Sequence, residues 1–281
     1  MNPFDMSLRN VLLACMVILL AGCTTLPRLD PSVLIERIEN TYANCQSFED
    51  SGSLREIELE AGQTNIAQVT YEIQFVRDRV FRMELHVQRD HGVGPYSLIY
   101  YWDGHRWSTY DSIQLYYGWS PVRTNQDSVL GSGVALSSGV FPLMFRLLRV
   151  QEDDSSALRI YDRGKVRVER LEGKPVYHLR LWLEAGPFYD LDDYWVDPQT
   201  YTILKWRQHR RRNWGDHIEV TTRDALAAPQ VNTLSPETVI QFEPPLPNRI
   251  RTEHRTGATD SLREKAHVMT SPIGQHDDHT R

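Results

Sequence analysis

The chain has 281 residues, of which 41% are hydrophobic and 24% are charged, and its net charge is −6. These proportions are ordinary for a globular protein and argue against a disordered chain or a multi-span membrane protein. The acidic balance argues against nucleic acid as the main partner, because a phosphate backbone is bound by concentrated positive charge. The sequence has no glycine-rich phosphate loop, HExxH helix or GxSxG turn. We therefore expect a protein that is not an enzyme and that has no cofactor.

The first 22 residues have the layout of a secretory signal. Arg9 precedes the apolar run 11–21, which is shorter than the about 20 residues of a membrane-spanning helix. The run ends in Leu20-Ala21-Gly22-Cys23, which resembles the lipobox of bacterial lipoproteins. That resemblance implies cleavage before Cys23 and lipid attachment to Cys23, and an uncleaved anchor is the alternative. Thr24 stands where an aspartate would retain an enterobacterial lipoprotein in the inner membrane, which implies the periplasmic face of the outer membrane.

The lipobox resemblance and the composition together divide the chain into four segments: a signal peptide (1–22), a lipidated linker (23–30), a folded domain (31–248) and a tail (249–281). The tail contains few core-forming residues, so we expect it to be disordered. Its His276 and His279 could bind a transition metal weakly, but an unstructured tract is the preferred interpretation and we expect no metal site.

The folded domain begins with a predicted helix over residues 31–45. Leu34, Ile38, Tyr42 and Cys45 recur at helical spacing, so one apolar face should pack on the rest of the domain. Asp30 before Pro31 predicts the cap at the start of this helix. The same spacing predicts that the Cys45 thiol is a buried apolar group rather than a reactive one.

Alternating apolar and polar residues then predict an antiparallel meander. The predicted strands are 69–75, 81–87, 96–102, 105–110, 113–119, 158–161, 165–171, 176–183, 192–197, 202–209 and 217–222. Asp78, Asp103-Gly104 and Asp197-Pro198 predict tight turns between neighbouring strands. A short apolar helix over 140–148 interrupts the meander.

This arrangement resembles the LolA/LolB-like family of bacterial lipoprotein carriers and receptors. The resemblance rests on residues 38–45, Trp102-Asp103-Gly104, residues 194–200 and Phe242-Glu243-Pro244-Pro245, and it covers roughly residues 31–246. It implies an α+β, mainly β fold: a strongly curved antiparallel sheet, or unclosed half-barrel, with the helix and the small helical insert on its concave side. It also implies a cavity that binds acyl chains.

Aromatic residues gather in one segment of the predicted meander. Residues 100–119 contain eight Tyr and Trp residues, four times the share expected from an aromatic content of 10%. Large amphipathic rings suit the rim of an acyl groove, and ordinary core packing is the alternative interpretation. The predicted groove-lining residues are Tyr100, Trp102, Trp107 and Tyr110.

Three further clusters carry weaker signals. Arg207, Arg210, Arg211 and Arg212 lie between two tryptophans and are candidates for contact with a membrane surface, with a solvated hairpin tip as the alternative. Asp190, Asp192, Asp193 and Asp197 resemble a calcium loop only in composition, because the glycine and terminal glutamate of that loop are missing. His178 and His217 are expected to be satisfied strand histidines rather than catalytic bases.

Two functions remain open at this stage. The first is a non-catalytic outer-membrane lipoprotein, facing the periplasm, that binds lipid or lipoprotein acyl chains in an apolar groove. The second is an assembly lipoprotein of the cell envelope that docks a protein partner through its sheet edge and basic hairpin. An empty groove would favour the first function, and a groove filled by the protein's own side chains would favour the second.

Overall fold

The structure is a computed structural model. It describes residues 26–60, 62–90, 94–113, 116–121, 147–148, 158, 161, 163–213, 215, 217–239 and 251–253, with backbone only for 116–121 and 251–253. The signal peptide, Cys23 and the segment Phe242-Glu243-Pro244-Pro245 lie outside the described residues. Within those residues, no helix is long and apolar enough to cross a membrane.

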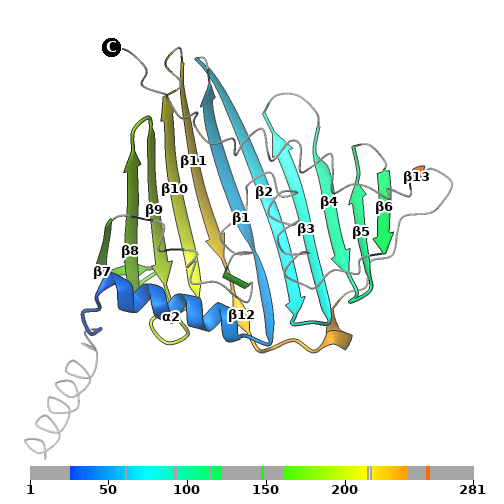
Figure 1. The fold of residues 1–281 in the computed structure, drawn as a ribbon, viewed down its shortest axis with the longest axis horizontal. Helices are drawn as coiled ribbons and strands as arrows, with labels where there is room; N and C mark the ends of the chain where they lie inside the picture. Colours follow the sequence, from blue (N-terminus) through cyan, green and yellow to red (C-terminus); the bar gives the residue numbers. More distant parts are fainter. Residues whose placement is uncertain are drawn as a thin grey trace, which may run out of the picture.

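In the described part of the chain, thirteen strands form one sheet (Figure 1). The strands are β1 (Ser47–Glu60), β2 (Gln63–Val76), β3 (Val80–Arg89), β4 (Tyr96–Trp102), β5 (Arg106–Asp111), β6 (Tyr116–Pro121), β7 (Arg163–Leu171), β8 (Lys174–Ala185), β9 (Phe188–Val196), β10 (Ile203–Asn213), β11 (Ile218–Ala227), β12 (Gln230–Val231) and β13 (Arg251–Glu253). Their order across the sheet is β13-β6-β5-β4-β3-β2-β1-β11-β10-β9-β8-β7, and β12 pairs with β1. All pairs are antiparallel except β13 with β6.

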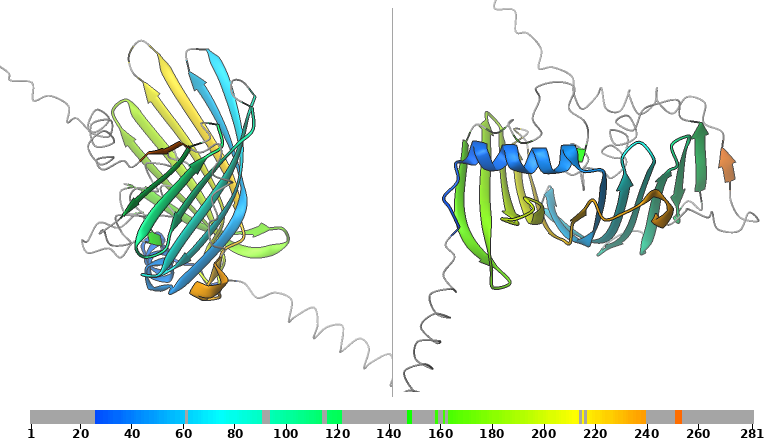
Figure 2. Two further views of the ribbon diagram at one scale, coloured as in Figure 1. Left: turned by 90° about the vertical axis from the view of Figure 1, so that its right-hand side faces the viewer. Right: turned by 90° about the horizontal axis from the view of Figure 1, so that it is seen from below.

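Helix α2 (Pro31–Asn44) lies across the concave side of this curved sheet, at the end formed by β7 to β11 (Figure 2). The predicted cap is confirmed, because Asp30 Oδ1 accepts a hydrogen bond of 2.9 Å from the Ser32 N–H. The predicted apolar face is also confirmed: Leu34, Ile38 and Tyr42 are fully buried. The Tyr42 hydroxyl accepts a hydrogen bond of 3.0 Å from the Ile203 N–H, which fixes the helix to β10. The predicted mainly β half-barrel with a helix on its concave side is therefore confirmed.

Most predicted strands and turns are also present. The strand predicted over residues 96–102 is β4 with the same bounds, and the other confirmed strands differ by a few residues at their ends. Asp103 Oδ1 accepts hydrogen bonds from the N–H groups of His105 and Arg106, which stabilises the predicted hairpin turn, and Gly104 has a φ of +90° there. The Asp197 side chain closes the turn between β9 and β10 in the same way.

Two differences from the predicted elements have physical causes. Strand β1 was not predicted, because its inward positions include Asp50 and Gly52 instead of large apolar residues. The predicted strand 158–161 is wrong at both of its described ends: Leu158 lies in a bend and Tyr161 in no regular element. Their side chains nevertheless pack inward, with Leu158 fully buried and Tyr161 against the core.

The main core lies on the concave face, between the sheet and α2. It includes the inward side chains of β2 and β3 together with Cys45, whose burial agrees with the prediction. Leu147 and Leu148 are helical and buried in the same core, so the predicted helical insert is confirmed at these two positions, and its other residues lie outside the described part. A smaller apolar cluster, Val76, Val80, Tyr101 and Val239, lies on the outer face.

Candidate functional site

Three of the four predicted groove-lining residues share the concave face. Trp102 on β4 is directly opposite Trp107 on β5, and Tyr100 is two positions from Trp102 on the same face. The Trp107 ring stacks on the rings of Phe81 and Tyr100, with centroid separations of 6.2 Å and 6.0 Å. Tyr100 and Trp102 are buried, with exposed fractions of 6% and 4%, whereas Trp107 is half-buried at the edge of the core. The segment therefore forms one aromatic cluster: Phe81, Tyr100, Trp102 and Trp107.

The fourth predicted residue lies on the other side of the sheet. Tyr110 is opposite Ile99, and both positions alternate with those of Trp107 and Tyr100. Tyr110 therefore does not share the face of the aromatic cluster. The hairpin loop decides this difference: it places Trp102 opposite Trp107, so the odd-numbered residues of β5 face the core.

The sheet is wider than the helix on its concave face is long. A helix of 14 residues is about 21 Å long at 1.5 Å per residue. Twelve strands side by side span about 50 Å, since neighbouring strands are about 4.8 Å apart. Helix α2 can therefore cover less than half of the sheet. Among the described residues outside α2 and the sheet, the buried apolar side chains of this core come from Cys45, Leu147, Leu148 and Leu158. We call the apolar part of the concave face the acyl floor. Its margin includes Tyr96, Leu98 and Trp107, which are only partly buried.

The acyl floor contains one polar group without a hydrogen-bond partner in the described residues. The Trp102 Nε1–H is buried and has no hydrogen-bond acceptor there. The neighbouring Tyr100 hydroxyl is also shielded from water, and burial raises its pKa to about 12. The polar atoms of Tyr100 and Trp102 are thus both shielded from water.

Toward the β7 end, the concave face becomes polar. Asp192 is buried there and accepts hydrogen bonds from Tyr194 Oη at 2.7 Å, from Gln208 Nε2 at 3.1 Å and from Tyr161 Oη. Burial raises the pKa of Asp192 despite these donors. The hydroxyl and amide donors satisfy this carboxyl group without a metal ion, and no group of metal ligands occurs among the described residues. Asp193 points to the opposite face, so the aspartates considered for a calcium loop do not converge.

His178 lies on the outer face and has both ring nitrogens engaged. Its Nδ1 is 2.7 Å from Glu169 Oε1 and its Nε2 is 2.6 Å from Asp193 Oδ1. Its ring also stacks on Trp195 at 4.6 Å. Because a general base needs a free nitrogen, this geometry fits a satisfied structural histidine, as predicted.

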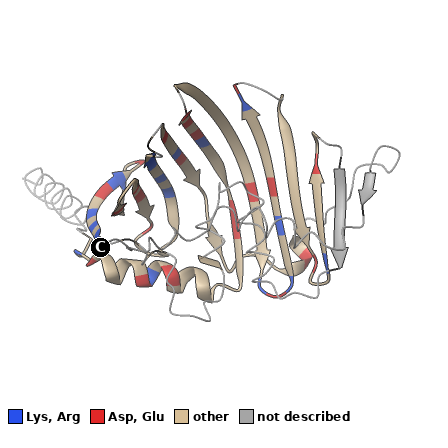
Figure 3. Cartoon of the chain, turned by 45° about the horizontal axis from the view of Figure 1, so that its top comes forward, with Lys and Arg blue, Asp and Glu red and all other residues tan. Residues whose placement is uncertain are grey.

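The basic run is distributed over both faces of β10. The strand extends to Asn213, so Arg207 lies in mid-strand rather than at the predicted hairpin tip. Arg207 Nε donates to Asp224 Oδ1 at 2.6 Å on the outer face, while Arg210 Nε is 3.7 Å from Asp190 Oδ2 on the concave face. Acidic and basic residues lie close together on the strands of this end of the sheet (Figure 3). The four arginines, Arg207, Arg210, Arg211 and Arg212, therefore do not form one basic surface.

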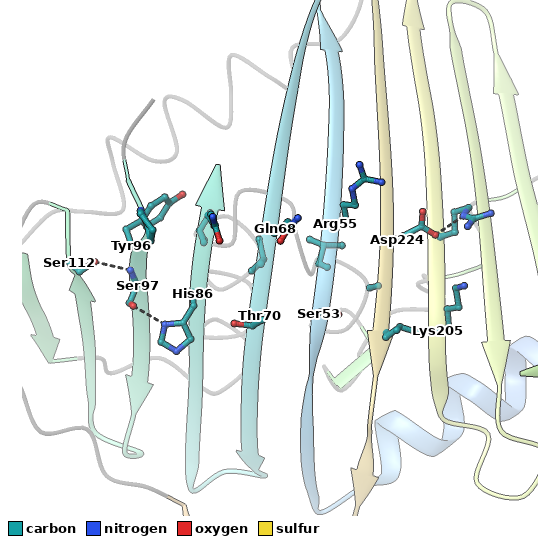
Figure 4. Close-up of a pocket in the computed structure, with 18 residues that line it drawn as sticks. Ser53, Arg55, Gln68, Thr70, His86, Tyr96, Ser97, Ser112, Lys205 and Asp224 are labelled. Atoms are coloured by element: carbon teal, nitrogen blue, oxygen red, sulfur yellow. Dashed lines mark hydrogen bonds and ion pairs between the residues drawn. The ribbon is translucent and has the colours of Figure 1, made fainter. Parts of the chain in front are cut away.

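A groove of about 620 Å³ lies on the face of the sheet opposite α2 (Figure 4). Polar residues such as Arg55 on β1, Gln68 and Thr70 on β2, and Lys205 on β10 line it together with apolar ones such as Leu226 on β11. Sequence patterns did not predict this outer-face groove, because lining residues such as Arg55 and Lys205 are 150 positions apart and carry no motif. The alternation of polar residues along β1, β2 and β3 is the only sequence signal that places them on one face.

Comparison with known proteins finds similarity of fold without a sequence family. No protein-family model matches the chain, and no curated protein sequence matches it. The solved structures similar to this chain include LprF from Mycobacterium bovis, with 6% identity, a TM-score of 0.40, and coverage of 75% of this chain and 97% of that one. A domain assigned to outer membrane lipoprotein sorting, from Vibrio parahaemolyticus, has 10% identity, a TM-score of 0.26 and coverages of 73% and 95%. MucB in complex with MucA has 15% identity, a TM-score of 0.30 and coverages of 71% and 56%.

Proposed function

We propose that this protein is a non-catalytic lipoprotein of the bacterial cell envelope that binds an acyl chain on the concave face of its sheet. The observation that supports this proposal is that the sheet is more than twice as wide as α2 is long, and that Tyr96, Leu98 and Trp107 on its concave face remain partly exposed. The partly exposed rings and side chains at this margin are costly in water, at about 25 cal/mol per Å² of apolar surface. A bound acyl chain would cover such surface.

The predicted lipobox supports the proposed location in the cell envelope. Lipid on Cys23 would hold the domain at the membrane through residues 24–30, and we propose the periplasmic face of the outer membrane as the location. An anchored domain with an apolar groove is suited to hold an acylated ligand next to a bilayer. The acyl chain contributes about 0.8 kcal/mol for each buried CH₂ group, which is sufficient for measurable binding.

The position of the ligand follows from the burial of the aromatic residues. Trp102 is nearly inaccessible, so its main contribution is to the core. Trp107 is half-buried and stacks on that core, which makes it the accessible part of the aromatic cluster. We therefore place the acyl chain along Trp107 and Leu98, at the margin of the region that Leu147 and Leu148 cover.

A fluorescent fatty-acid probe tests this position on a chain that begins at residue 24, purified without detergent. We expect Trp107→Ala to weaken probe binding at least fivefold, because it removes the accessible ring. Tyr110→Ala is the matched control, since it removes a ring from the same strand on the opposite face, and it should leave binding unchanged. Circular dichroism should confirm that the sheet is intact in both variants.

Native mass spectrometry of the same preparation should detect co-purified acylated molecules. If the folded chain binds no probe and carries no lipid, the concave face is filled by the protein's own side chains. The second function, docking of a protein partner in the envelope, would then replace acyl binding.

A further inference from the structure

The outer-face groove has a regular construction that follows from strand register. Ser53 on β1 is opposite Thr70 on β2, Thr70 is opposite His86 on β3, and His86 is opposite Ser97 on β4. Side chains that are directly opposite one another share a face of the sheet. Small hydroxyl residues therefore occupy most of a row that crosses four adjacent strands.

Longer side chains form the neighbouring row, two positions along each strand. Arg55 is opposite Gln68 on one side and Asp224 on the other, and Gln68 is opposite Gln88. Because a strand rises about 3.4 Å per residue, the two rows are about 7 Å apart. The row of short side chains is therefore the floor of the groove, and the row of long side chains is its wall. Its volume of about 620 Å³ lies in the range of small-ligand sites.

The shape of the groove favours an extended ligand. Lining residues come from β10, β11, β1, β2, β3 and β4, which lie side by side in that order. Six strands span about 24 Å, so the groove is long enough for a chain of several units (Figure 4). The backbones of β1, β2 and β3 are hydrogen-bonded on both sides, which leaves no strand edge to which a peptide could add.

The lining chemistry matches hydroxyl groups. Hydroxyls at Ser53 and Thr70 and carboxamides at Gln68 and Gln88 can each donate and accept hydrogen bonds. Sugar hydroxyls need partners of both kinds. The groove is also lined by apolar residues, against which the carbon faces of sugar rings could pack; among them Leu226 is 48% exposed, whereas Leu54, Val69 and Val87 are buried.

The charge balance of the groove favours an anionic ligand. Arg207 is paired with Asp224, at 2.6 Å. Arg55 makes no ion pair with the described residues, and Lys205 Nζ lies over the Trp195 ring, 4.9 Å from its centroid. These two cations can each reach the solvent side of the groove, where they could pair with carboxylates of a ligand.

We propose that the outer-face groove binds an oligosaccharide that carries carboxylate groups, with Ser53 and Thr70 on its floor and Arg55 and Lys205 contacting the acidic groups. This site lies on the opposite side of the sheet from the acyl floor and does not depend on it. The protein would then hold lipid on one face and an acidic glycan on the other.

Calorimetric titration of the full chain, in a detergent without a sugar headgroup, tests the proposal with tetragalacturonic acid as the probe. We expect binding that weakens as NaCl is raised, and at least fivefold weaker binding of neutral maltotetraose. Ser53→Tyr should reduce binding at least fivefold by filling the floor, and Arg55→Gln should do so by removing a cation.

Two control variants keep these tests specific. Ser51→Tyr introduces the same ring on the same face of β1, two positions outside the groove, and Arg211→Gln makes the same charge change elsewhere on the outer face. Both should bind the acidic tetrasaccharide like the unmodified chain. The proposal is overturned if no sugar binds, if the controls lose binding equally, or if tetraglutamate binds better than the sugar, which would identify an acidic peptide as the ligand. Binding of the fatty-acid probe should be unchanged in all four variants.

Discussion

Buried ionisable residues on the two faces respond to pH for different reasons. On the outer face, Asp193 is engaged by His178 and by a bidentate pair of hydrogen bonds from Arg180, at 2.7 Å and 3.1 Å. These partners outweigh burial and lower the pKa of Asp193 to about 2. On the concave face, Asp50 has hydrogen-bond donors but no cation within the described contacts, so burial dominates.

The first residue-scale prediction concerns His178. Burial lowers its pKa, but the hydrogen bonds to Asp193 and Glu169 outweigh burial and raise the pKa above 6.5. The charged His178 ring therefore stabilises the folded state fully below pH 6.5, and this stabilisation is lost as the pH rises through the pKa of His178 in the folded state. We expect the free energy of unfolding to fall as the pH rises above 6.5. His178→Asn should remove this slope in urea denaturation, and His86→Asn, at an exposed histidine, should keep it. An unchanged slope in His178→Asn would contradict the assignment.

The second residue-scale prediction concerns Asp50. Burial raises its pKa from 3.8 to about 7, although Tyr71 Oη and the Ala228 N–H donate hydrogen bonds to it at 3.0 Å and 2.8 Å. The folded state therefore favours the neutral acid, and stability is lost as pH rises from about 4 to 7. The rise of this pKa from 3.8 to about 7 corresponds to a loss of roughly 4 kcal/mol of folding free energy. Asp50→Asn should abolish the loss in this window, as measured by urea denaturation at pH 4, 5.5 and 7. A variant with the wild-type pH profile would show that Asp50 is ionised in the fold.

At the scale of elements, β1 joins the two halves of the sheet. It pairs with β2 on one side and with β11 on the other, so it connects the meander β1–β6 to the meander β7–β11. Gly52 lies at a close approach in this central strand. A Cβ atom there would be 2.0 Å from the carbonyl oxygen of Leu226 and 2.8 Å from Tyr71 Oη. The carbonyl oxygen belongs to backbone and cannot move without displacing β11.

We therefore expect Gly52→Ala to destabilise the protein by about 3 kcal/mol or more, at the upper end of overpacking effects. Thermal denaturation measures the change. Ser51→Ala is the matched control, because it alters the adjacent exposed position of the same strand, and its melting temperature should stay within a few degrees of wild type. If Gly52→Ala has the same melting temperature as Ser51→Ala, β1 and β11 are farther apart than described.

At the scale of the whole molecule, the sheet separates two chemical environments. The concave face carries the core, α2 and the aromatic cluster, and the outer face carries the polar groove and the His178 network. A curved sheet produces this separation because successive side chains alternate between its faces. The chain can therefore present an apolar and a polar site without a second domain.

The whole-molecule prediction concerns membrane anchoring. If Cys23 receives the lipid, Cys23→Ser should abolish incorporation of a clickable fatty acid in bacterial cells, because no thiol remains at the predicted cleavage site. Labelled protein is detected by in-gel fluorescence, and Cys45→Ser is the control, since Cys45 is buried and should not affect labelling. Equal label on Cys23→Ser and wild type would contradict the lipoprotein assignment.

Local sequence patterns predicted most of the elements of this protein. The alternation in β2, β3 and β4, the helical spacing of Leu34, Ile38 and Tyr42, and the Asp103 turn depend on residues that are close in the chain. Each follows from backbone geometry and from one apolar face, so each could be predicted from a short stretch of sequence. The antiparallel meander followed from their order, and its curvature was implied by the family resemblance.

Tertiary structure alone decided the features that depend on distant partners. Strand β1 has polar inward positions that are satisfied by residues far along the chain, such as Ala228. Trp107 rather than Tyr110 faces the core because the geometry of one hairpin loop sets the register of β5. The outer-face groove exists because β1 meets β11, which brings Arg55 next to Asp224. Strand pairing over such separations is a property of the folded chain, since it is stabilised by contacts that no local segment contains.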